Sequence, residues 1–429
     1  MNGAQSREPA VICPSCHNEV QGGDAFCCRC GAPLHAALAA TPPPPAAVAV
    51  SLTPSVPAAH TPSVHDYGAA ASHLLSGIGA RLSAFTSTGK LEGFSLQDMF
   101  SETFRHRSPQ EIEDYLLVGT ARTTPDILEV NTGWPKPWFF ARVFLFVAAV
   151  YVLFLGSLAF FANPKFIPGF IFMGSLAVPL AVLVLFFELN TPRNVSFYSL
   201  LALVAMGGVL SLIVASIGYQ TSFLDSLGAP QAGIVEEVAK LAAVVIICRQ
   251  TKHKYILNGM LFGAAIGAGF AAFETAGYAQ DAFLSGMAQV GFNTQNFFGA
   301  GGSSYLNSEL FTRAWLSPFG HVVWTAITAG ALWRAKKDLP FNFHMLDATF
   351  WKTFLIPMGC HMVWDSTLAM GASNPNLFNY GVTLALGAVS WYVAFGLVQQ
   401  GLRQVAEEQV LVLKKTQPQT ATALGIALT

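Results

Sequence analysis

The chain has 429 residues, of which 53% are hydrophobic and only 11% are charged, and its formal net charge is −1. Soluble globular chains carry about 25% charged residues, so this composition excludes an ordinary soluble protein and is typical of a polytopic membrane protein. The near-zero net charge gives no indication of a nucleic-acid partner. We therefore expect an all-α bundle of about eight transmembrane helices in a lipid bilayer, preceded by small N-terminal segments.

Residues 11–35 contain five of the seven cysteines, arranged as two CxxC pairs separated by ten residues. Two such pairs can bind one zinc ion tetrahedrally, and a redox or disulfide pair is the alternative interpretation. The pattern predicts a small zinc ribbon, which is typically structural or a docking module for a protein partner. Its zinc ligands would be Cys13, Cys16, Cys27 and Cys30.

Residues 36–91 are rich in Pro, Ala and Ser, which predicts a disordered linker with partly extended polyproline geometry. Residues 92–133 regain helical signals. In "SPQEIEDYLLVG", Ser108 is the expected N-cap, Pro109 the first helical residue and Glu111 the third, which together form a capping box. We expect a short cytoplasmic helical segment that packs under the membrane domain.

From residue 138 onward, apolar runs near the roughly 20 residues needed to cross a bilayer follow one another. They define a transmembrane domain over 134–405, with a C-terminal tail over 406–429. The expected spans are 138–162, 167–189, 196–218, 231–249, 255–279, 313–334, 350–371 and 380–402.

Loop charge predicts the orientation of these spans. The basic loops "RQTKHK" (249–254) and "RAKK" (334–337) should be cytoplasmic. The connection 280–312, which is rich in Gly, Asn and Ser, then lies outside. Both termini are expected to be cytoplasmic, in a compartment that keeps the zinc-ligating thiols reduced.

Charged and imidazole side chains interrupt four of the expected spans. Each ionised group near the centre of a membrane helix costs roughly 2.5–3.5 kcal/mol on insertion scales, so their presence indicates function. At 1.5 Å per helical residue, most of them fall in one slab, roughly 8–15 Å below the outer surface. These residues are Glu236, Glu237, Lys240, Glu274, His321, His361 and Asp365.

A shared depth predicts one shared site. Lys240 is one helical turn from both Glu236 and Glu237, so it should pair with one of them and leave the other free to act. In the fifth span, Gly259, Gly263 and Gly267 form a row for close helix packing, and continuing this row leads to Glu274. Glu274 should therefore face neighbouring helices and not lipid.

Such a cluster suits activation of water inside a low-dielectric bundle. A carboxylate with a tuned pKa can act as the general base, or two histidines and a carboxylate can hold a metal that activates the water. Both arrangements fit peptide-bond hydrolysis within or beside the membrane. Neither an HExxH motif nor a serine-protease constellation is present in the spans. The candidate ligands for a catalytic divalent metal are His321, His361 and Glu274.

Four short motifs occur together in a characteristic order: "EEVAK" (236–240), "FAAFE" (270–274), "HVVW" (321–324) and "HMVWD" (361–365). Their order and spacing resemble those of the PrsW family of intramembrane proteases, which is related to the CAAX prenyl endopeptidases and bacteriocin-immunity membrane proteins. The likeness covers roughly residues 138–402 and leaves out the cysteine-rich and Pro-rich segments. It implies a bacterial inner-membrane peptidase that cleaves membrane-anchored proteins, such as anti-sigma factors, on the extracytoplasmic side.

The resemblance also implies roles for single residues. Glu236 would be the catalytic base, with Glu237 and Lys240 completing the first motif. His321 and His361 would orient the water or ligate a metal, and Glu274 occupies the place of a histidine in the CAAX-type relatives. Asp365 stands where those relatives carry an oxyanion-stabilising Asn, so it must be protonated, hold His361, or bind metal.

Two other function classes remain open on the sequence. The same Glu and His residues could form the relay of a proton-coupled transporter, although they are biased to one side of the bilayer and no repeat symmetry is evident. The chain could also be a non-catalytic sensor or scaffold whose zinc ribbon recruits a partner. Within the site, Glu236, Glu237 and Lys240 could be a structural ion cluster.

Overall fold

The computed structural model describes residues 11–12, 19–20, 76–221, 224–290, 302–371 and 377–419. The chain divides into two compact units, residues 1–63 and 64–429. In the first unit, β1 (Val11–Ile12) pairs antiparallel with β2 (Glu19–Val20). The four cysteines predicted to bind zinc lie outside the described residues, so the zinc ribbon stays a prediction.

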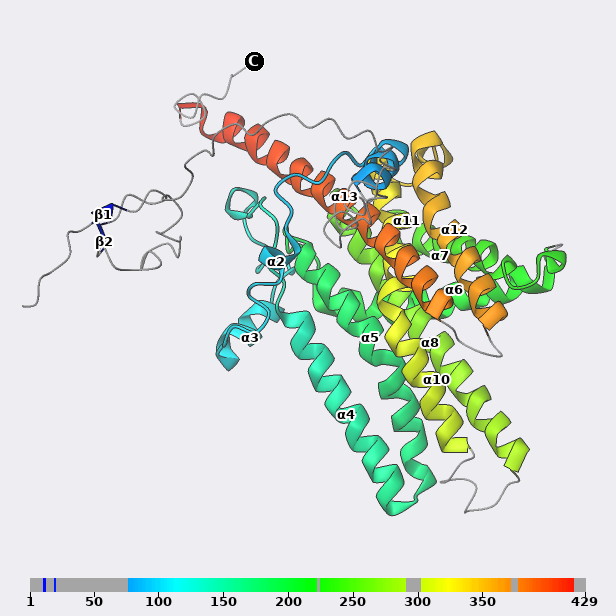
Figure 1. Ribbon diagram of the computed structural model, residues 1–429. Coiled ribbons are helices and arrows are strands. Elements are labelled where there is room, and N and C mark those ends of the chain that lie inside the picture. Colours follow the sequence, from blue (N-terminus) through cyan, green and yellow to red (C-terminus); the bar gives the residue numbers. More distant parts are fainter. Residues whose placement is uncertain are drawn as a thin grey trace, which may run out of the picture. The chain divides into compact units, whose positions relative to one another are not determined.

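The described part of the second unit is helical, which confirms the all-α polytopic fold (Figure 1). After a helix at residues 76–86, three short elements precede the bundle: α2 (Leu96–Met99), α3 (Pro109–Leu116) and the 3-10 turn η1 (Ile127–Glu129). The bundle helices are α4 (Phe139–Phe161), α5 (Ile167–Leu189), α6 (Phe197–Thr221), α7 (Gln231–Cys248), α8 (Ile256–Val290), α10 (Gly302–Leu316), α11 (His321–Lys336), α12 (Ala348–Gly371) and α13 (Leu377–Thr416).

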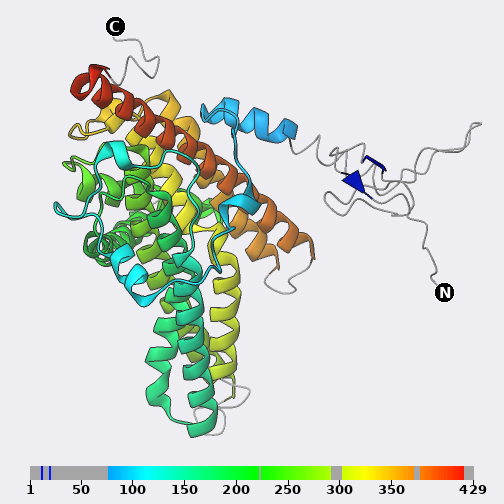
Figure 2. The ribbon, with the colours of Figure 1, turned by 90° about the vertical axis from the view of Figure 1, so that its left-hand side faces the viewer.

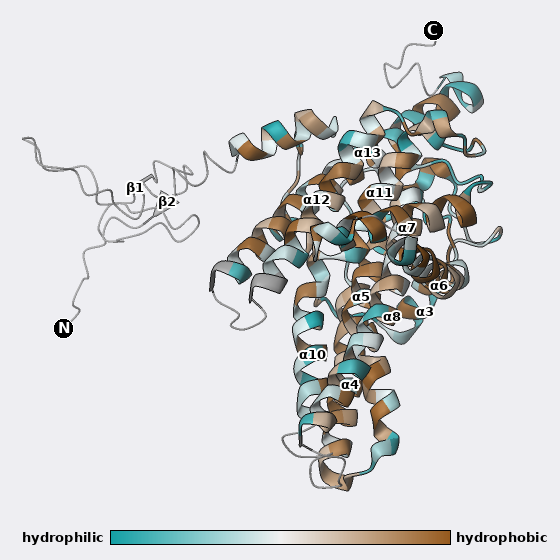
Figure 3. Ribbon diagram, turned by 90° about the vertical axis from the view of Figure 1, so that its right-hand side faces the viewer, coloured by the Kyte–Doolittle hydropathy of each residue, from teal (hydrophilic) through white to brown (hydrophobic). Residues whose placement is uncertain are grey.

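Within the described ranges, five helical stretches are long and apolar enough to cross a membrane: 139–161, 164–189, 197–221, 256–289 and 379–416. Apolar residues predominate along the long helices (Figure 3). On α4, the side chains of Phe146, Leu153 and Phe160 are exposed, as expected for a lipid-facing surface. The chain is therefore an integral membrane protein. The other three predicted spans correspond to α7, to the end of α10 with α11, and to α12, and these carry most of the polar site residues.

Helices α4 and α5 form a hairpin (Figures 1 and 2). The buried carboxylate of Glu188 links the two helices at one end. Glu188, near the end of α5, accepts hydrogen bonds from the backbone N–H groups of Trp138 (2.6 Å), Phe139 (2.8 Å) and Phe140 (2.8 Å). The first N–H groups of a helix have no partner within the helix. Glu188 thus caps α4 from a neighbouring helix and fixes the start of the bundle.

The predicted glycine row brings α8 and α11 into direct backbone contact. A Cβ atom added at Gly263 would lie 2.2 Å from the carbonyl oxygen of Thr325, and one at Gly267 would lie 2.5 Å from the carbonyl oxygen of His321. Real Cβ atoms do not approach backbone this closely, so only glycine fits. The row therefore faces α11 and holds the start of that helix against α8.

Two predicted boundaries differ from the structure around residues 280–312. Helix α8 does not end at 279 but continues to Val290, and α10 covers 302–316. Leu306 and Leu310 of α10 share a buried cluster with Phe170 of α5 and Ala279 of α8. These tertiary contacts stabilise helices in a segment whose Gly, Asn and Ser content suggested only a connection.

The sixth predicted span, 313–334, is broken. Helix α10 ends at Leu316, a 3-10 turn η4 (Ser317–Phe319) follows, and α11 begins at His321. Pro318 has no backbone N–H, and Gly320 adopts φ −111° and ψ −138° as the N-cap residue of α11. The break places His321 at the first residue of a new helix.

The N-terminal border of the membrane domain also differs from expectation. Residues 76–86 form a helix, although they belong to the predicted disordered linker 36–91. Thr86 and Thr88 are buried, and Arg334 donates a hydrogen bond to the carbonyl oxygen of Thr86. Contact with the bundle therefore orders the last part of the linker. At the other end, α13 continues to Thr416, into the residues assigned to the C-terminal tail.

The capping box predicted at the start of α3 is confirmed. The Ser108 hydroxyl accepts the backbone N–H of Glu111, and the Glu111 carboxylate accepts the backbone N–H of Ser108 at 2.6 Å. The hydrogen bond from the Ser108 backbone lowers the pKa of Glu111, because it stabilises the ionised carboxylate. Helix α3 packs through Ile112, Tyr115 and Leu116 against the start of α4.

Candidate active site

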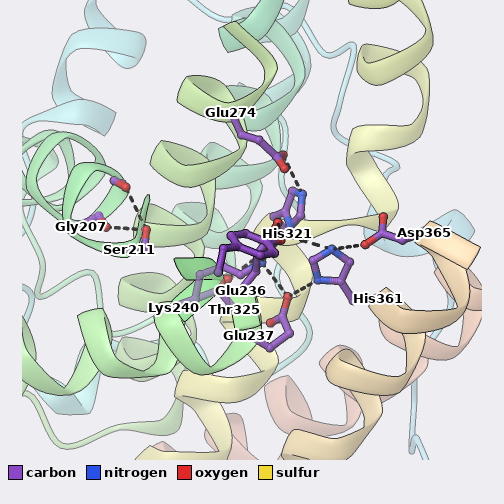
Figure 4. Close-up of polar contacts among 12 residues, drawn as sticks. Gly207, Ser211, Glu236, Glu237, Lys240, Glu274, His321, Thr325, His361 and Asp365 are labelled. Carbon is purple, nitrogen blue, oxygen red and sulfur yellow. Dashed lines mark hydrogen bonds and ion pairs between the residues drawn. The ribbon is translucent and has the colours of Figure 1, made fainter. Parts of the chain in front are cut away.

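All seven polar residues predicted to share a site lie in one connected network (Figure 4). Four helices contribute to it, although they are far apart in the sequence. The network runs by direct contacts from α8 through α11 and α7 to α12. Its members are Glu274 on α8, His321 on α11, Glu236, Glu237 and Lys240 on α7, and His361 and Asp365 on α12.

Lys240 is the centre of the network and has no exposed surface. Its Nζ lies 2.6 Å from Glu237 Oε1 and 3.8 Å from Glu236 Oε2, which matches the expected pairing with one of the two acids. It also lies 2.8 Å from Nδ1 of His321 and 4.4 Å from the centre of the Phe270 ring. Lys240 therefore joins α7 to α11, which the sequence did not indicate.

The contacts of His321 determine its tautomer. The Lys240 ammonium can only donate, so Nδ1 accepts and the ring proton lies on Nε2. That nitrogen is 3.1 Å from Glu274 Oε2. The same oxygen of Glu274 receives a hydrogen bond from Nη2 of Arg313 at 2.6 Å. Glu274 thus faces α10 and α11 and not lipid, as its position in the glycine row predicted.

His361 is held between carboxylates and an aromatic ring. Its Nδ1 lies 2.9 Å from Glu237 Oε1, and its imidazole stacks on the Trp324 ring at 4.7 Å between centroids. A carboxylate at Nδ1 leaves Nε2 as the nitrogen that faces the site. Nε2 lies 3.2 Å from Asp365 Oδ2, one turn along α12, and 3.7 Å from Glu236 Oε2.

Two carboxylate oxygens next to His361 Nε2 lack a hydrogen bond. Glu236 Oε2 and Asp365 Oδ2 are both buried without a hydrogen-bond partner; the contact of Asp365 with His361 is close but not aligned as one. Glu237 Oε2 is a third such oxygen, but its side chain has no exposed surface. Leaving buried oxygens unpaired is costly, so Glu236 Oε2 and Asp365 Oδ2 are acceptors for a bound group. A water, a divalent cation or substrate would fit these acceptors.

The residues also fit a metal on charge and geometry. Ligand atoms of Glu236, His321 and His361 all lie within 4.8 Å of one another. The network contains four carboxyl groups but only two permanent cations, Lys240 and Arg313, and a dication would balance this difference. For His321 to ligate, it would exchange its contact with Lys240 or with Glu274. The acidic ligand in this group of three residues is Glu236, whereas the sequence suggested Glu274. Both ligand sets remain proposals.

A cavity of about 430 Å³ opens onto one side of the network. It lies between α7, α8, α10, α11 and α12, and its lining includes Glu236, Glu274, His321, His361 and Asp365. Glu237 and Lys240 do not line it. The network residues that line the cavity can therefore contact a substrate. Glu237 and Lys240 lie behind them, and Glu237 contacts His361 from that side.

Three features of the site were not found from the sequence. Tyr219 of α6 donates a hydrogen bond from its hydroxyl to Glu236 Oε1 at 2.8 Å, and Arg313 binds Glu274. Both lie at the edges of predicted spans, where a polar residue is ordinary. The third is the break before His321, for which "SPFGH" carried a signal, since Pro and Gly often end a helix.

Tyr219 fixes one oxygen of Glu236 and leaves the other free, so we expect Tyr219→Phe to impair the reaction. Outer partners of this kind typically change activity or metal affinity about 10–100-fold, while one lost hydrogen bond costs about 1 kcal/mol of stability. The activity and thermal unfolding of Tyr219→Phe should be compared with those of Tyr198→Phe, an exposed position on the same helix. Unchanged activity in Tyr219→Phe would show that Glu236 needs no such support.

Comparison with known proteins supports the functional interpretation of this network. Residues 195–405 match the family model described as PrsW family intramembrane metalloprotease. This range begins just before α6 and ends within α13, so it contains every network residue. No curated protein and no solved structure matches the chain significantly.

Proposed function

Because this chain belongs to the PrsW family of intramembrane metalloproteases through residues 195–405 and is therefore a peptidase, we propose that it hydrolyses membrane-anchored proteins at the cavity beside Glu236. The observation that carries this proposal is the pair of oxygens without a hydrogen bond, Glu236 Oε2 and Asp365 Oδ2, which lie 3.7 and 3.2 Å from His361 Nε2. They offer a place for a nucleophilic water within reach of a base.

In the proposed reaction, Glu236 Oε2 accepts a proton from the water as the water oxygen attacks the carbonyl carbon of the peptide bond. Tyr219 holds Oε1, so the free oxygen is directed toward His361. The carbonyl π electrons move to its oxygen. When the tetrahedral intermediate collapses, the C–N bond breaks and the protonated Glu236 returns its proton to the leaving amine.

In the alternative, metal-dependent reaction, a divalent metal would be held by Glu236, His321 and His361, whose ligand atoms all lie within 4.8 Å of one another. Glu236 would then be a ligand and not the base. When bound, such a metal supplies Lewis-acid activation of water, lowering the pKa of the water toward neutrality. Glu237 would orient His361 from behind through Nδ1, as outer-shell carboxylates do for ligating imidazoles. Lys240 would hold Glu237 in place.

The metal content of the protein tests directly whether the reaction depends on Glu236 as the base or on a bound metal. If the site is a metal centre, the full chain with Cys13, Cys16, Cys27 and Cys30 changed to Ser should retain about one divalent ion per molecule. The further change of His361→Ala should remove it, because one of three ligands is lost. Elemental analysis by mass spectrometry measures both. Activity in a variant that holds no divalent ion would favour the glutamate mechanism instead.

The substrate class follows from the resemblance and the position of the site. The network lies near the N-terminal third of α7, away from the basic loop 249–254. With basic loops on the cytoplasmic side, the site belongs to the extracytoplasmic half, which fits cleavage of membrane-anchored proteins such as anti-sigma factors. We propose a bacterial inner-membrane location with both termini in the cytoplasm.

The proposed activity can be tested with a defined substrate pool. We expect the protein in lipid vesicles to cleave a subset of single-span membrane peptides with randomised extracytoplasmic flanks, with products identified by mass spectrometry. Cleavage should fall within or just outside the apolar segment. A transporter or scaffold would leave the pool intact, and that result with folded protein would defeat the proposal.

A further inference from the structure

Peptide hydrolysis needs a group that stabilises the negative charge on the carbonyl oxygen, and this inference rests on the proposed function. Hydrogen-bond donors aimed at that charge are usually among the largest contributions to catalysis. The residues that line the cavity near the base include the carboxylates of Glu236, Glu274 and Asp365, which repel an oxyanion when ionised. The donor must therefore come from another part of the cavity wall.

The lining also offers neutral donors, which include the hydroxyls of Tyr278, Thr312 and Ser317 and the Trp364 indole, but a cation stabilises a negative oxygen more strongly than a neutral donor does. No Asn or Gln belongs to the described lining residues. The Trp324 indole donates to Ser390 at 3.0 Å, and His361 is engaged by Glu237 and Asp365. Arg313 of α10 is the one permanent cation among the described residues of this wall.

Arg313 is held in a fixed position by three contacts. Its Nη2 donates to Glu274 Oε2 at 2.6 Å, and its Nε donates to Thr275 Oγ1 at 3.1 Å. Its guanidinium carbon also lies 4.2 Å from the centre of the Tyr278 ring. A group fixed before the substrate binds requires little reorganisation during the reaction.

One end of the guanidinium remains available. Nη1 forms an ion pair with Glu309 Oε1 at 3.9 Å, which is beyond hydrogen-bond distance. The side chain of Arg313 is 23% exposed, and the residue lines the cavity. Nη1 therefore offers N–H donors that the described residues leave unused.

Arg313 and the proposed base, Glu236, line the same cavity and are joined by a chain of contacts. The steps from Arg313 to Glu236 are 2.6 Å to Glu274, 3.1 Å on to His321, and at most 4.8 Å from His321 to Glu236. A base, water, carbonyl and donor in sequence span roughly 7–9 Å, given hydrogen bonds of about 3 Å and an attack distance of about 3 Å. Both groups line the same cavity, and the proposed reaction places the peptide carbonyl between them.

We propose that Arg313 is a catalytic residue whose Nη1 donates to the carbonyl oxygen of the scissile bond as that oxygen becomes negative. Water adds to the carbonyl carbon, its proton goes to Glu236, and the π electron pair goes to the oxygen bound by Arg313. When the C–N bond breaks, the pair returns and the oxygen becomes part of the new carboxyl group. Glu274 keeps the guanidinium in place throughout.

The test uses the full chain in vesicles and one single-span peptide chosen from the pool cleaved by the wild type. We expect Arg313→Gln to lower kcat about 10²–10³-fold with KM changed less than about 3-fold, since the contact forms only in the transition state. Arg313→Lys keeps a charge beside Glu274 and should fold normally, yet it loses the second donor arm and should lose most of kcat. Thermal unfolding checks the fold of each variant.

A double-mutant cycle separates direct contact from an effect through Glu274. If Arg313 only holds Glu274, the double change of Glu274→Gln with Arg313→Gln should be no worse than Glu274→Gln alone. We expect the double variant to lose at least a further 10-fold in kcat. A raised KM with normal kcat, or no additional loss in the double variant, would overturn the role proposed for Arg313. A wild-type protein that cleaves nothing would instead refute the proposed function, and an active Glu236→Gln variant would refute Glu236 as the base.

Discussion

Replacing Glu236 by Gln is expected to reduce kcat by about 10²–10⁴-fold, the range for loss of a positioned general base. Gln has the same shape, and its amide oxygen can still accept the hydrogen bond from Tyr219 that Glu236 Oε1 accepts at 2.8 Å. It cannot take a proton from water. The folded state should therefore persist while cleavage of the single-span peptide is nearly abolished.

Two variants serve as controls for this result. Glu113→Gln changes an exposed acid of α3 and should have no effect on cleavage. Asp365→Asn alters the other unpartnered carboxylate and should reduce activity by about 10-fold, since it perturbs His361 but keeps the base. If Asp365→Asn were inactive and Glu236→Gln active, Asp365 would be the base.

Replacing Lys240 by Met is expected to destabilise the protein by about 3–5 kcal/mol, because it leaves a buried charge without its partner. Both Lys240 and Glu237 have no exposed surface, and their 2.6 Å contact is the shortest ion pair of α7. Without Lys240, Glu237 would retain only His361. We expect a lower unfolding midpoint in detergent together with loss of cleavage.

A double variant tests whether the unpaired charge of Glu237 causes this loss of stability. Lys240→Met combined with Glu237→Gln removes both charges, so it should recover much of the lost stability without recovering activity. The free energies of unfolding of the wild type, Lys240→Met, Glu237→Gln and the double variant together give the coupling energy between the two residues. A Lys240→Met protein as stable as the wild type would mean that the pair contributes little to the fold.

The spans were predictable because the bilayer imposes a strong constraint on composition and length. The predicted span 167–189 coincides with α5, and 231–249 differs from α7 by one residue. The convergence of the site was also predictable, since depth along a straight helix follows from residue number. The glycine row also predicted which face of α8 packs against another helix, and therefore which way Glu274 faces.

The rotation of each helix about its own axis and the breaks within helices were harder to predict, because packing between helices determines both. Arg313 was placed at the edge of a span, but α10 ends before the turn at Ser317–Phe319 and Arg313 binds Glu274 of α8. Likewise, α10 is stabilised by contacts with distant helices, such as the hydrogen bond from Tyr151 to Asn307 at 2.7 Å. No local pattern in 302–316 encodes those contacts. Tyr219 was missed for the same reason.

The central claim is that imidazoles from α11 and α12 meet beside Glu236, and the distance between those rings tests it most directly. The account predicts 4.9 Å between the ring centroids of His321 and His361. Solid-state NMR on histidine-labelled protein in lipid vesicles should therefore show a through-space correlation between the two rings that disappears in His361→Asn and in His321→Asn. Well-resolved spectra of folded, membrane-embedded protein with no such correlation would contradict a shared site.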